Sequence, residues 1–296
     1  YLQYGGVLRV VRADGANLVN ANVGAIGVSS NATLKIKSFD DYQNNHEDAT
    51  NFRVAARNPG SYANGLKVAY IDGAADQTLT VSPHVTTRVV VGQGVTQPIS
   101  GTIAGVGTNV TIDGYLQGII TGVGASSIDV KVANHVSAAG TIFPVTYTEN
   151  GIYAFGVGST VTNTLPGDGL LVSGFSGSTI ADPDAGISTC ASVLAVQDWY
   201  DNQFIQLKNG ALPWKEIAEK PGTSGYANAR NSKNDELHIV IIDDSGKISG
   251  TQGAILEKFA FLSKADDAVN SFGSAIYYKD FIAENSDNIF VGVSTG

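Results

Sequence analysis

The segment "FRVAARNPGSYANGLKVAYID" (residues 52–72) contains two strand-forming runs separated by a turn. The first run, Phe52 to Ala56, ends before Asn58-Pro59-Gly60, a combination typical of tight turns. A loop of small residues leads to the second β-prone run, Leu66 to Ile71. Gly60 and Gly65 follow turn-forming residues, so we attribute them to positive φ and not to ligand binding. The segment therefore predicts two strands of a scaffold.

Similar runs lie on both sides of this segment. Residues 7–12 and 34–37 predict strands, and the polar stretch 40–45 predicts a loop. The continuous apolar run 237–242 is typical of a central strand that is buried on both faces. Residues 204–207 and 212 onward flank Lys208-Asn209-Gly210, which predicts a hairpin.

Helical spacing enters only near the carboxyl end. Residues 254–262 fit either a strand or a helix, because Ile255, Phe259 and Leu262 also recur at helical intervals. Residues 274–285 predict an amphipathic helix, and residues 289–293 predict a closing strand. Strands and helices together predict an α+β platform built on a mixed sheet.

The composition changes between Asp76 and Val196. The only cations there are Arg88 and Lys131. Short β-type runs bounded by glycine recur at residues 85–91, 109–112 and 117–121, and residues 128–132 alternate strictly. Residues 143–155 predict a hairpin around Asn150-Gly151. Evenly spaced short strands predict a small barrel or a sandwich. We predict an inserted, glycine-rich all-β domain at residues 78–188, carried by a discontinuous platform of residues 1–77 and 189–296.

Length and charge limit the functional classes. A chain of 296 residues can bury a sizeable core and form two domains. Its net charge of −9 and pI of about 4.8 repel phosphates, and no basic run offsets them, so we expect no nucleic-acid partner. No apolar span reaches the length of a membrane helix, so we expect no membrane insertion.

Sulfur-containing residues are scarce. Cys190 is the single cysteine, which excludes an intrachain disulfide, and a small buried hydrophobe is the ordinary role of a lone thiol. Methionine is absent, so Tyr1 is no natural translation start. We expect the chain to be a fragment of a longer protein, truncated at both ends.

Glycine and histidine motifs give weak signals. Gly92-Gln93-Gly94 has no helix behind it, which favours a pair of loop glycines over a dinucleotide site. The run Gly174 to Ser178 misses the spacing of a nucleophile elbow. His84 and His135 could meet as metal ligands, but two polar positions on a β surface are the simpler interpretation.

Acidic and aromatic clusters also have plain interpretations. Residues 182–186 lack the full spacing of a calcium loop and fit an ordinary turn. Asp243 and Asp244 could serve a hydrolase, but a solvated hairpin tip explains them more simply. Several aromatics could form a glycan-stacking platform or anchor a core or interface, and the second role is more common: Trp199-Tyr200, Trp214 and Tyr277-Tyr278. We therefore predict no catalytic residue, no cofactor and no metal.

Four stretches resemble the contractile tail sheath proteins of T4-like myophages, especially marine and cyanobacterial ones. They are "YLQYGGVLRVVRA" (1–13), residues 52–72, "WKEIAEKPGTSGYANARNSKNDELHIVIIDDSGKISGTQGAILEKFAFLSKADDA" (214–268) and "YYKDFIAENSDNIFVGV" (277–293), in the family's order. The large insert departs from that pattern, because it follows the Pro-Gly segment and not the first strand. The resemblance therefore implies nothing about the fold of residues 78–188.

The resemblance implies a structural protein with no enzymatic activity. Sheath subunits form rings around the tail tube, connect to the baseplate, and contract to drive the tube through the host envelope. The implied partners are neighbouring sheath subunits, the tube and the baseplate. The implied location is the virion, after assembly in the host cytoplasm. The alternative is a surface-exposed, β-rich adhesin or glycan-binding module of a virion.

Overall fold

The computed structural model describes residues 15, 17–23, 31–82, 90–98, 101–103, 110–112, 114–144, 160–162, 169–177, 199–208 and 210–292. About 16% of the chain is helix and 37% is strand, arranged in several antiparallel sheets, which is compatible with the predicted α+β class. All pairings between named strands in these residues are antiparallel, so the predicted mixed sheet is not found there. The predicted strand 7–12, most of 85–91 and the hairpin beyond residue 144 lie outside the described residues.

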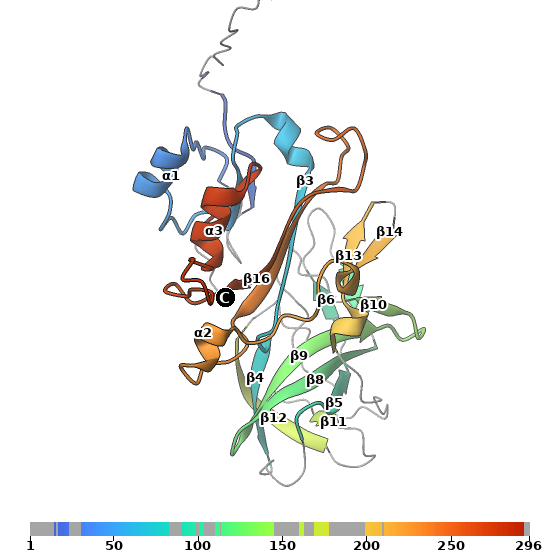
Figure 1. Cartoon of the computed structure of the whole chain (residues 1–296). Helices are drawn as coiled ribbons and strands as arrows, with labels where there is room; N and C mark the ends of the chain where they lie inside the picture. Colours follow the sequence, from blue (N-terminus) through green and yellow to red (C-terminus); the bar gives the residue numbers. More distant parts are fainter. Residues whose placement is uncertain are drawn as a thin grey trace, which may run out of the picture.

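Three strands form the sheet that organises the upper part of the molecule in Figure 1: β16 (Ala254–Ser263), β15 (Glu236–Asp243) and β3 (Leu66–Asp72). β15 is central and almost wholly buried, as its apolar run predicts. Its side chains alternate between two cores. Leu237, Ile239 and Ile241 pack against α3 (Tyr278–Asn285), and Val240 and Ile242 pack against the aromatic cluster on the other face.

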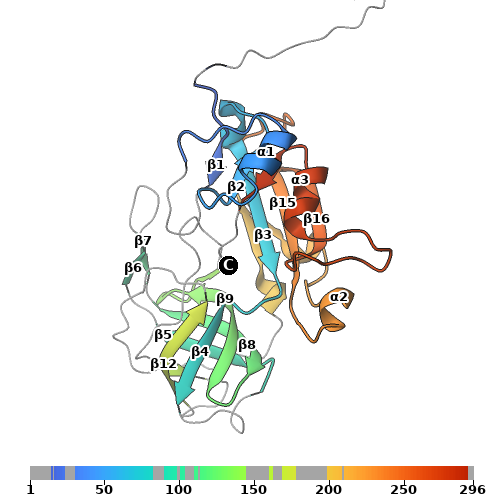
Figure 2. The same cartoon turned by 90° about the vertical axis from the view of Figure 1, so that its left-hand side faces the viewer.

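A second three-stranded sheet is built from β1 (Asn22–Val23), β2 (Val54–Ala56) and β17 (Ile289–Val291). α1 (Phe39–Asn45) covers it, and Tyr42 of this helix stacks on Phe290 with ring centroids 4.5 Å apart. Figure 2 shows α1 beside β1 and β2, and α3 beside β15 and β16. The chain between the two sheets contains η2 (Ser61–Gly65), directly before β3.

Two local predictions in this part are wrong. Residues 40–45 form α1 and not a loop, because Ser38 caps the helix by accepting a hydrogen bond from the Asp41 N–H, and Asp40 and Asp41 favour its first turn. Residues 34–37 are not a strand, although Leu34 and Ile36 are buried as their alternation requires. Their backbone is hydrogen-bonded to Asn20 instead. The Oδ1 of Asn20 accepts from the Ile36 N–H at 2.8 Å.

Residues 254–262 belong to strand β16. The apparent helical spacing comes from two register shifts against β15, which break the two-residue period of a strand. At one shift, Phe261 adopts φ 57° and its N–H donates to Nδ1 of the buried His238. The predicted helix 274–285 is present, but α3 begins at Tyr278.

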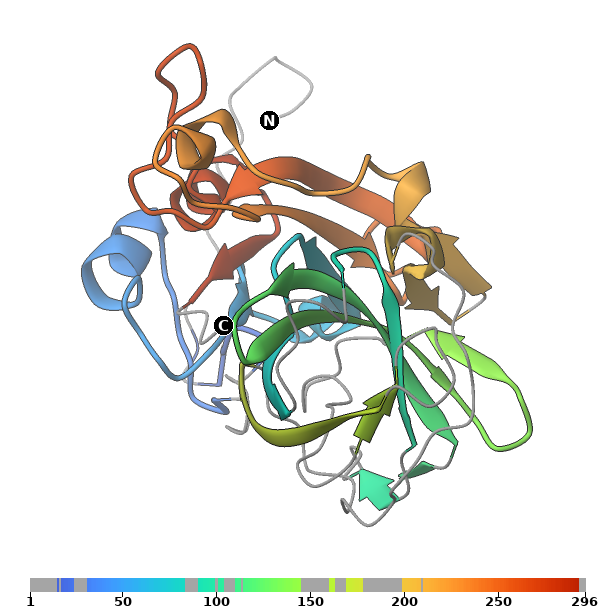
Figure 3. The same cartoon turned by 90° about the horizontal axis from the view of Figure 1, so that it is seen from below.

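The lower part of the molecule is a seven-stranded sheet in the order β10-β9-β4-β12-β11-β5-β8, and β8 also pairs with β9 (Figures 1 and 3). Its strands are β4 (Gln77–Ser82), β5 (Gly94–Pro98), β8 (Tyr115–Val123), β9 (Ser127–Val136), β10 (Ile142–Pro144), β11 (Thr160–Thr162) and β12 (Gly169–Gly177). Because β8 also pairs with β9, the pairings join six of these strands in a ring, in which β11 and β5 meet through one residue pair, Thr162 with Thr96. A small separate pair, β6 (Gly101–Ile103) with β7 (Val110–Ile112), completes the described strands of this part.

The remaining elements connect and cover these sheets. They are η3 (Trp199–Asn202), the hairpin of β13 (Phe204–Leu207) and β14 (Gly210–Pro213), η4 (Trp214–Glu216) and α2 (Gly225–Asn228). The predicted hairpin is confirmed, with Leu207 opposite Gly210. The predicted boundary between residues 188 and 189 lies outside the described residues, so the domain division remains a prediction.

Candidate functional site

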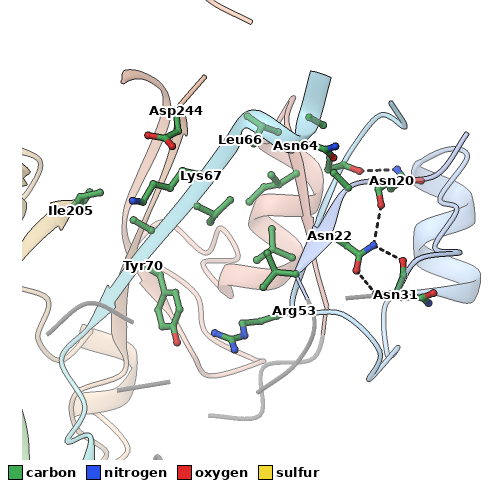
Figure 4. Close-up of a pocket in the computed structure, with 18 of the residues that line it drawn as sticks. Asn20, Asn22, Asn31, Arg53, Asn64, Leu66, Lys67, Tyr70, Ile205 and Asp244 are labelled. Atoms are coloured by element: carbon green, nitrogen blue, oxygen red, sulfur yellow. Dashed lines mark hydrogen bonds between the residues drawn. The ribbon is translucent and has the colours of Figure 1, made fainter. Parts of the chain in front are cut away.

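A groove runs along β3, and we call it the β3 groove (Figure 4). Its volume is about 840 Å³, within the usual range of ligand sites. One wall consists of six consecutive residues of β3, Leu66 to Ile71. The opposite walls come from the segment 19–23, from β2 and from β13. Most of the lining is apolar, so the few charged side chains in it determine what the groove can recognise.

The lining contains two cations, Lys67 near Asp244 and Arg53 toward the Tyr70 end of β3 (Figure 4). The backbone of Arg53 is fixed, because its N–H donates to Val23 O at 2.7 Å and its carbonyl accepts from the Gly292 N–H at 2.8 Å. Among the described residues, its guanidinium has no hydrogen bond or ion pair, and Nη2 is a buried donor without an acceptor. Buried polar groups of this kind are rare in native proteins and call for an explanation.

Asp244 provides the matching anion at the other end of the groove. It follows β15 directly, next to the residue that pairs with Leu66 at the start of β3. Its Oδ1 is a buried acceptor without a donor, and its Oδ2 lies 3.7 Å from Nζ of Lys208, whose side chain is 58% exposed. Figure 4 shows Asp244 beside the Leu66–Lys67 end of β3 and Arg53 toward the Tyr70 end.

The carboxylate of the neighbouring Asp243 is hydrogen-bonded within its own loop. It is fully buried and accepts hydrogen bonds from the N–H groups of Lys247, Ile248 and Ser249 at 2.7–3.1 Å. Burial alone opposes its ionisation, but the Ser249 and Ile248 N–H groups more than offset this, so the pKa of Asp243 lies well below its usual range. The predicted solvated hairpin tip is therefore wrong for Asp243, which is a loop-forming carboxylate.

A buried ionic cluster, the Lys131 junction, lies where the two parts of the molecule meet. Lys131 of β9 is 2% exposed, and its Nζ lies 3.0 Å from both Asp72 Oδ1 and Asp76 Oδ1. It also lies 4.9 Å from the ring centroid of Trp199. Asp72 makes a second contact, at 3.1 Å, with the half-exposed Lys264.

The Lys131 junction joins the two segments in which the chain passes between the upper sheets and the seven-stranded sheet. Asp72 ends β3, Asp76 precedes β4, and Trp199 opens the segment described after β12. Asp76 also bonds the β9 backbone, because its Oδ2 accepts from the Val132 N–H at 2.7 Å. Burial raises the pKa of Asp72, but Lys131 and Lys264 outweigh it, so the net pKa is lowered and the carboxylate stays charged.

The predicted aromatic residues fall mainly in the core. Trp199, Tyr200 and Trp214 are about 5% exposed or less and pack with Val240 and Ile242, which confirms their role as core anchors. The hydroxyl of Tyr200 donates to Ala218 O at 2.8 Å. Tyr277 and Tyr278 form an edge-to-face pair that is only partly buried.

The other candidate residues give no site. Gly92 lies in a turn with φ 90°, as predicted, whereas Gly94 begins strand β5 and is not a loop glycine. His84, the side chain of His135, Cys190 and residues 182–186 lie outside what the structure describes. Within the described part, no group of three His, Cys, Asp or Glu side chains is placed to hold a metal, and no helix is long and apolar enough to cross a bilayer.

Sequence reasoning missed Arg53 and Lys131 as important residues. The alternation of residues 128–132 places Lys131 on the solvent side together with Asp129, whereas Lys131 is buried. The available signal was its isolation, since it is one of two cations between Asp76 and Val196. A lone cation in an apolar strand requires a buried carboxylate partner.

Comparisons with known proteins add no relative. No family model, no curated protein and no solved structure matches the chain. The functional argument therefore depends on the residues and their geometry.

Proposed function

We propose that the chain is a structural subunit of a contractile phage tail sheath. Three of the four resembling stretches fall on described residues, and they pack together. Residues 52–72 supply β2 and β3, residues 214–268 supply β15 and β16, and residues 277–293 supply α3 and β17. These elements share the core formed by Leu237, Ile282 and their neighbours, so segments far apart in sequence behave as one unit.

The Lys131 junction is the observation that carries this proposal. A subunit that transmits force among many copies has to move as a solid body. One buried lysine holds the ends of β3, β4 and β9 together with Trp199, which opposes rotation of the seven-stranded sheet against the rest of the chain. This arrangement suits mechanical work.

The finer organisation is part of the same proposal. Residues 78–188 form an inserted β domain of barrel or sandwich type, carried by a platform of residues 1–77 and 189–296. The chain has no reaction or cofactor of its own. Its partners are neighbouring sheath subunits, the tail tube and the baseplate, in the virion, and it binds neither nucleic acid nor the membrane interior.

Electron microscopy of tails from the intact virus tests the proposal. We expect density for this chain in a helical layer around the tube, in at least two packing states. A tail map in which the chain lies elsewhere, or in one copy per tail, contradicts it.

A surface-exposed, glycan-binding adhesin is the second candidate. The observation in its favour is the position of the seven-stranded sheet at the far end from α1 and α3 (Figure 1), in a stretch with only two cations. A glycan array probed with the whole chain discriminates between the two. Saturable binding of one glycan class supports the adhesin, and absence of binding favours the sheath subunit.

A further inference from the structure

The Lys131 junction holds an amine and two carboxylates in contact inside the protein. Nζ of Lys131 lies 3.0 Å from Oδ1 of Asp72 and 3.0 Å from Oδ1 of Asp76. The side chains of Lys131 and Asp76 are only 2% and 5% exposed. The surroundings are apolar, because the ring of Trp199 lies 4.9 Å from Nζ and the buried Ile119 is opposite Lys131 on β8. An ion pair in such surroundings has lost the hydration that favours its charged form.

The sheet fixes the amine and one of the carboxylates beside each other. The Asp76 N–H donates to Val130 O, so Asp76 continues the ladder of β4 and β9 next to Lys131. Oδ1 of Asp76 contacts the amine, and its Oδ2 accepts from the Val132 N–H at 2.7 Å. Two groups held in contact in this way react as one molecule, which corresponds to a very high effective concentration.

The two carboxylates are suited to different chemistry. Burial opposes the charge of Asp72, but Lys131 and Lys264 outweigh it and lower its pKa, so this carboxylate stays charged and can accept a proton. Asp76 has a backbone N–H on Oδ2, the atom on which negative charge develops when an amine attacks Cγ. Asp72 therefore suits a proton carrier, and Asp76 suits the acyl group.

We propose that the Lys131 junction is a site of covalent modification, in which Nζ of Lys131 forms an amide bond with Cγ of Asp76 and one water is released. A proton first moves from the ammonium to Oδ1 of Asp76, which leaves a neutral amine and a neutral acid. The amine lone pair then attacks Cγ, and the Val132 N–H stabilises the charge on Oδ2. Asp72 takes a second proton from the nitrogen and passes it to Oδ1. The bond between Cγ and Oδ1 breaks, and Oδ1 leaves as water.

The product leaves no carboxylate of the junction without a cation. Lys131 and Asp76 lose their charges together, and Asp72 keeps Lys264 at 3.1 Å. The new bond closes residues 76–131 into a covalent loop, which limits the freedom of the unfolded chain as a disulfide does. Cys190 is the single cysteine, so an amide is a cross-link that this chain can form within itself and an intrachain disulfide is not.

Mass spectrometry of the whole chain tests the proposal. We expect the folded protein, once denatured, to weigh one water less than its sequence requires. Trypsin cleaves the unlinked chain after Lys67, Arg88 and Lys131, which releases peptides 68–88 and 89–131. Trypsin does not cleave after an acylated lysine, so the linked chain gives peptide 68–88 joined to 89–208. Fragmentation of this pair shows which carboxylate carries the bond.

Variants separate the roles of the three side chains, and cell-free synthesis followed by intact mass gives the rate. Lys131→Arg keeps the positive charge but should retain the full mass, and so should Asp76→Ala. Asp72→Asn should form the bond at least about 100-fold more slowly, as loss of a proton carrier implies. Asp266→Asn removes an exposed carboxylate outside the junction and should leave the rate unchanged. Thermal unfolding shows that each variant is folded.

A different source of water loss lies in the same segment. Aspartate before glycine, as in Asp72-Gly73, can cyclise on its own backbone and also lose one water. That product remains in the linear peptide 68–88 and leaves peptide 89–131 free, so the digest distinguishes it from the cross-link.

Three outcomes overturn the proposal. They are a folded parent chain that keeps its full mass, a loss of water in which peptides 68–88 and 89–131 stay separate, and a bond that forms equally fast in Asp72→Asn. A full mass leaves the ion pair in place, so the sheath proposal stands or falls independently. The strength of the ion pair itself is measured on unlinked chain, which the intact mass identifies.

Discussion

Replacement of Lys131 by methionine tests the Lys131 junction directly. Methionine keeps most of the side-chain length but removes the charge, so Asp72 and Asp76 lose the cation that lies 3.0 Å from each. Asp76 is 5% exposed in its side chain and cannot turn to water. The variant therefore leaves buried charge uncompensated, whereas the rest of β9 stays in place.

The expected magnitude follows from burial. Removal of one partner of a buried ion pair destabilises proteins by about 3–5 kcal/mol. Asp72 keeps Lys264, and Asp76 keeps the Val132 N–H, so we expect a loss near the lower limit, about 3 kcal/mol. Lys264→Met is the matched control. It removes the other cation of Asp72, but its side chain is 37% exposed, and we expect a loss of about 0–1 kcal/mol.

Urea unfolding followed by tryptophan fluorescence measures both variants. Trp199 lies against Lys131, and Trp214 lies in the same core, so the signal reports on this region. Equal losses in the two variants, or a loss below about 1 kcal/mol in Lys131→Met, would refute the view that the buried cation holds the two parts together.

Other predictions concern the two cores and the response to acid. His238→Phe should lower the free energy of unfolding in urea by about 2–4 kcal/mol. Nε2 of His238 lies 2.7 Å from Glu219 O and Nδ1 accepts from the Phe261 N–H, so both backbone groups would lose their partner. The control His46→Phe, at a partly exposed position, should cost under about 1 kcal/mol. Tyr42→Phe should cost about 1 kcal/mol, because the hydroxyl donates to Val291 O at 2.6 Å while the stacked ring is retained. Asp72 has a lowered pKa in the folded state, so its contribution is fully present above its unfolded pKa of about 3.9 and is lost as the pH falls through the folded value. The free energy of unfolding between about pH 2 and 5 should therefore fall less steeply in Lys131→Met than in the parent, and parallel curves would contradict this prediction.

The strands that could be predicted are those whose burial alone determines their pattern. The run 237–242 has no polar position except His238, and it forms β15 between two cores. The helix α1 could not be read from periodicity, because seven mostly polar residues show no apolar stripe. Its signals were the Ser38 cap and the acidic first turn, which decide a short helix that packs through one tyrosine.

The candidate site was less predictable than the fold. Arg53 lies within a strand-forming run, where a cation at an alternate position usually faces water, and its isolation depends on a groove assembled from β1, β2, β3 and β13. The burial of Lys131 was equally unpredictable, because its partners Asp72 and Asp76 lie more than fifty residues away, at the end of β3 and before β4. Contacts between distant segments are not encoded in local spacing.

β3 is the element that the Lys131 junction and the β3 groove share. Its edge lines the groove, and its last residue, Asp72, anchors the seven-stranded sheet through Lys131. Because β15 holds β3 over seven residue pairs and Lys131 binds Asp72, β3 is fixed along one side and at its end. A force on β3 therefore passes to the three-stranded sheet through β15 and to the seven-stranded sheet through Lys131.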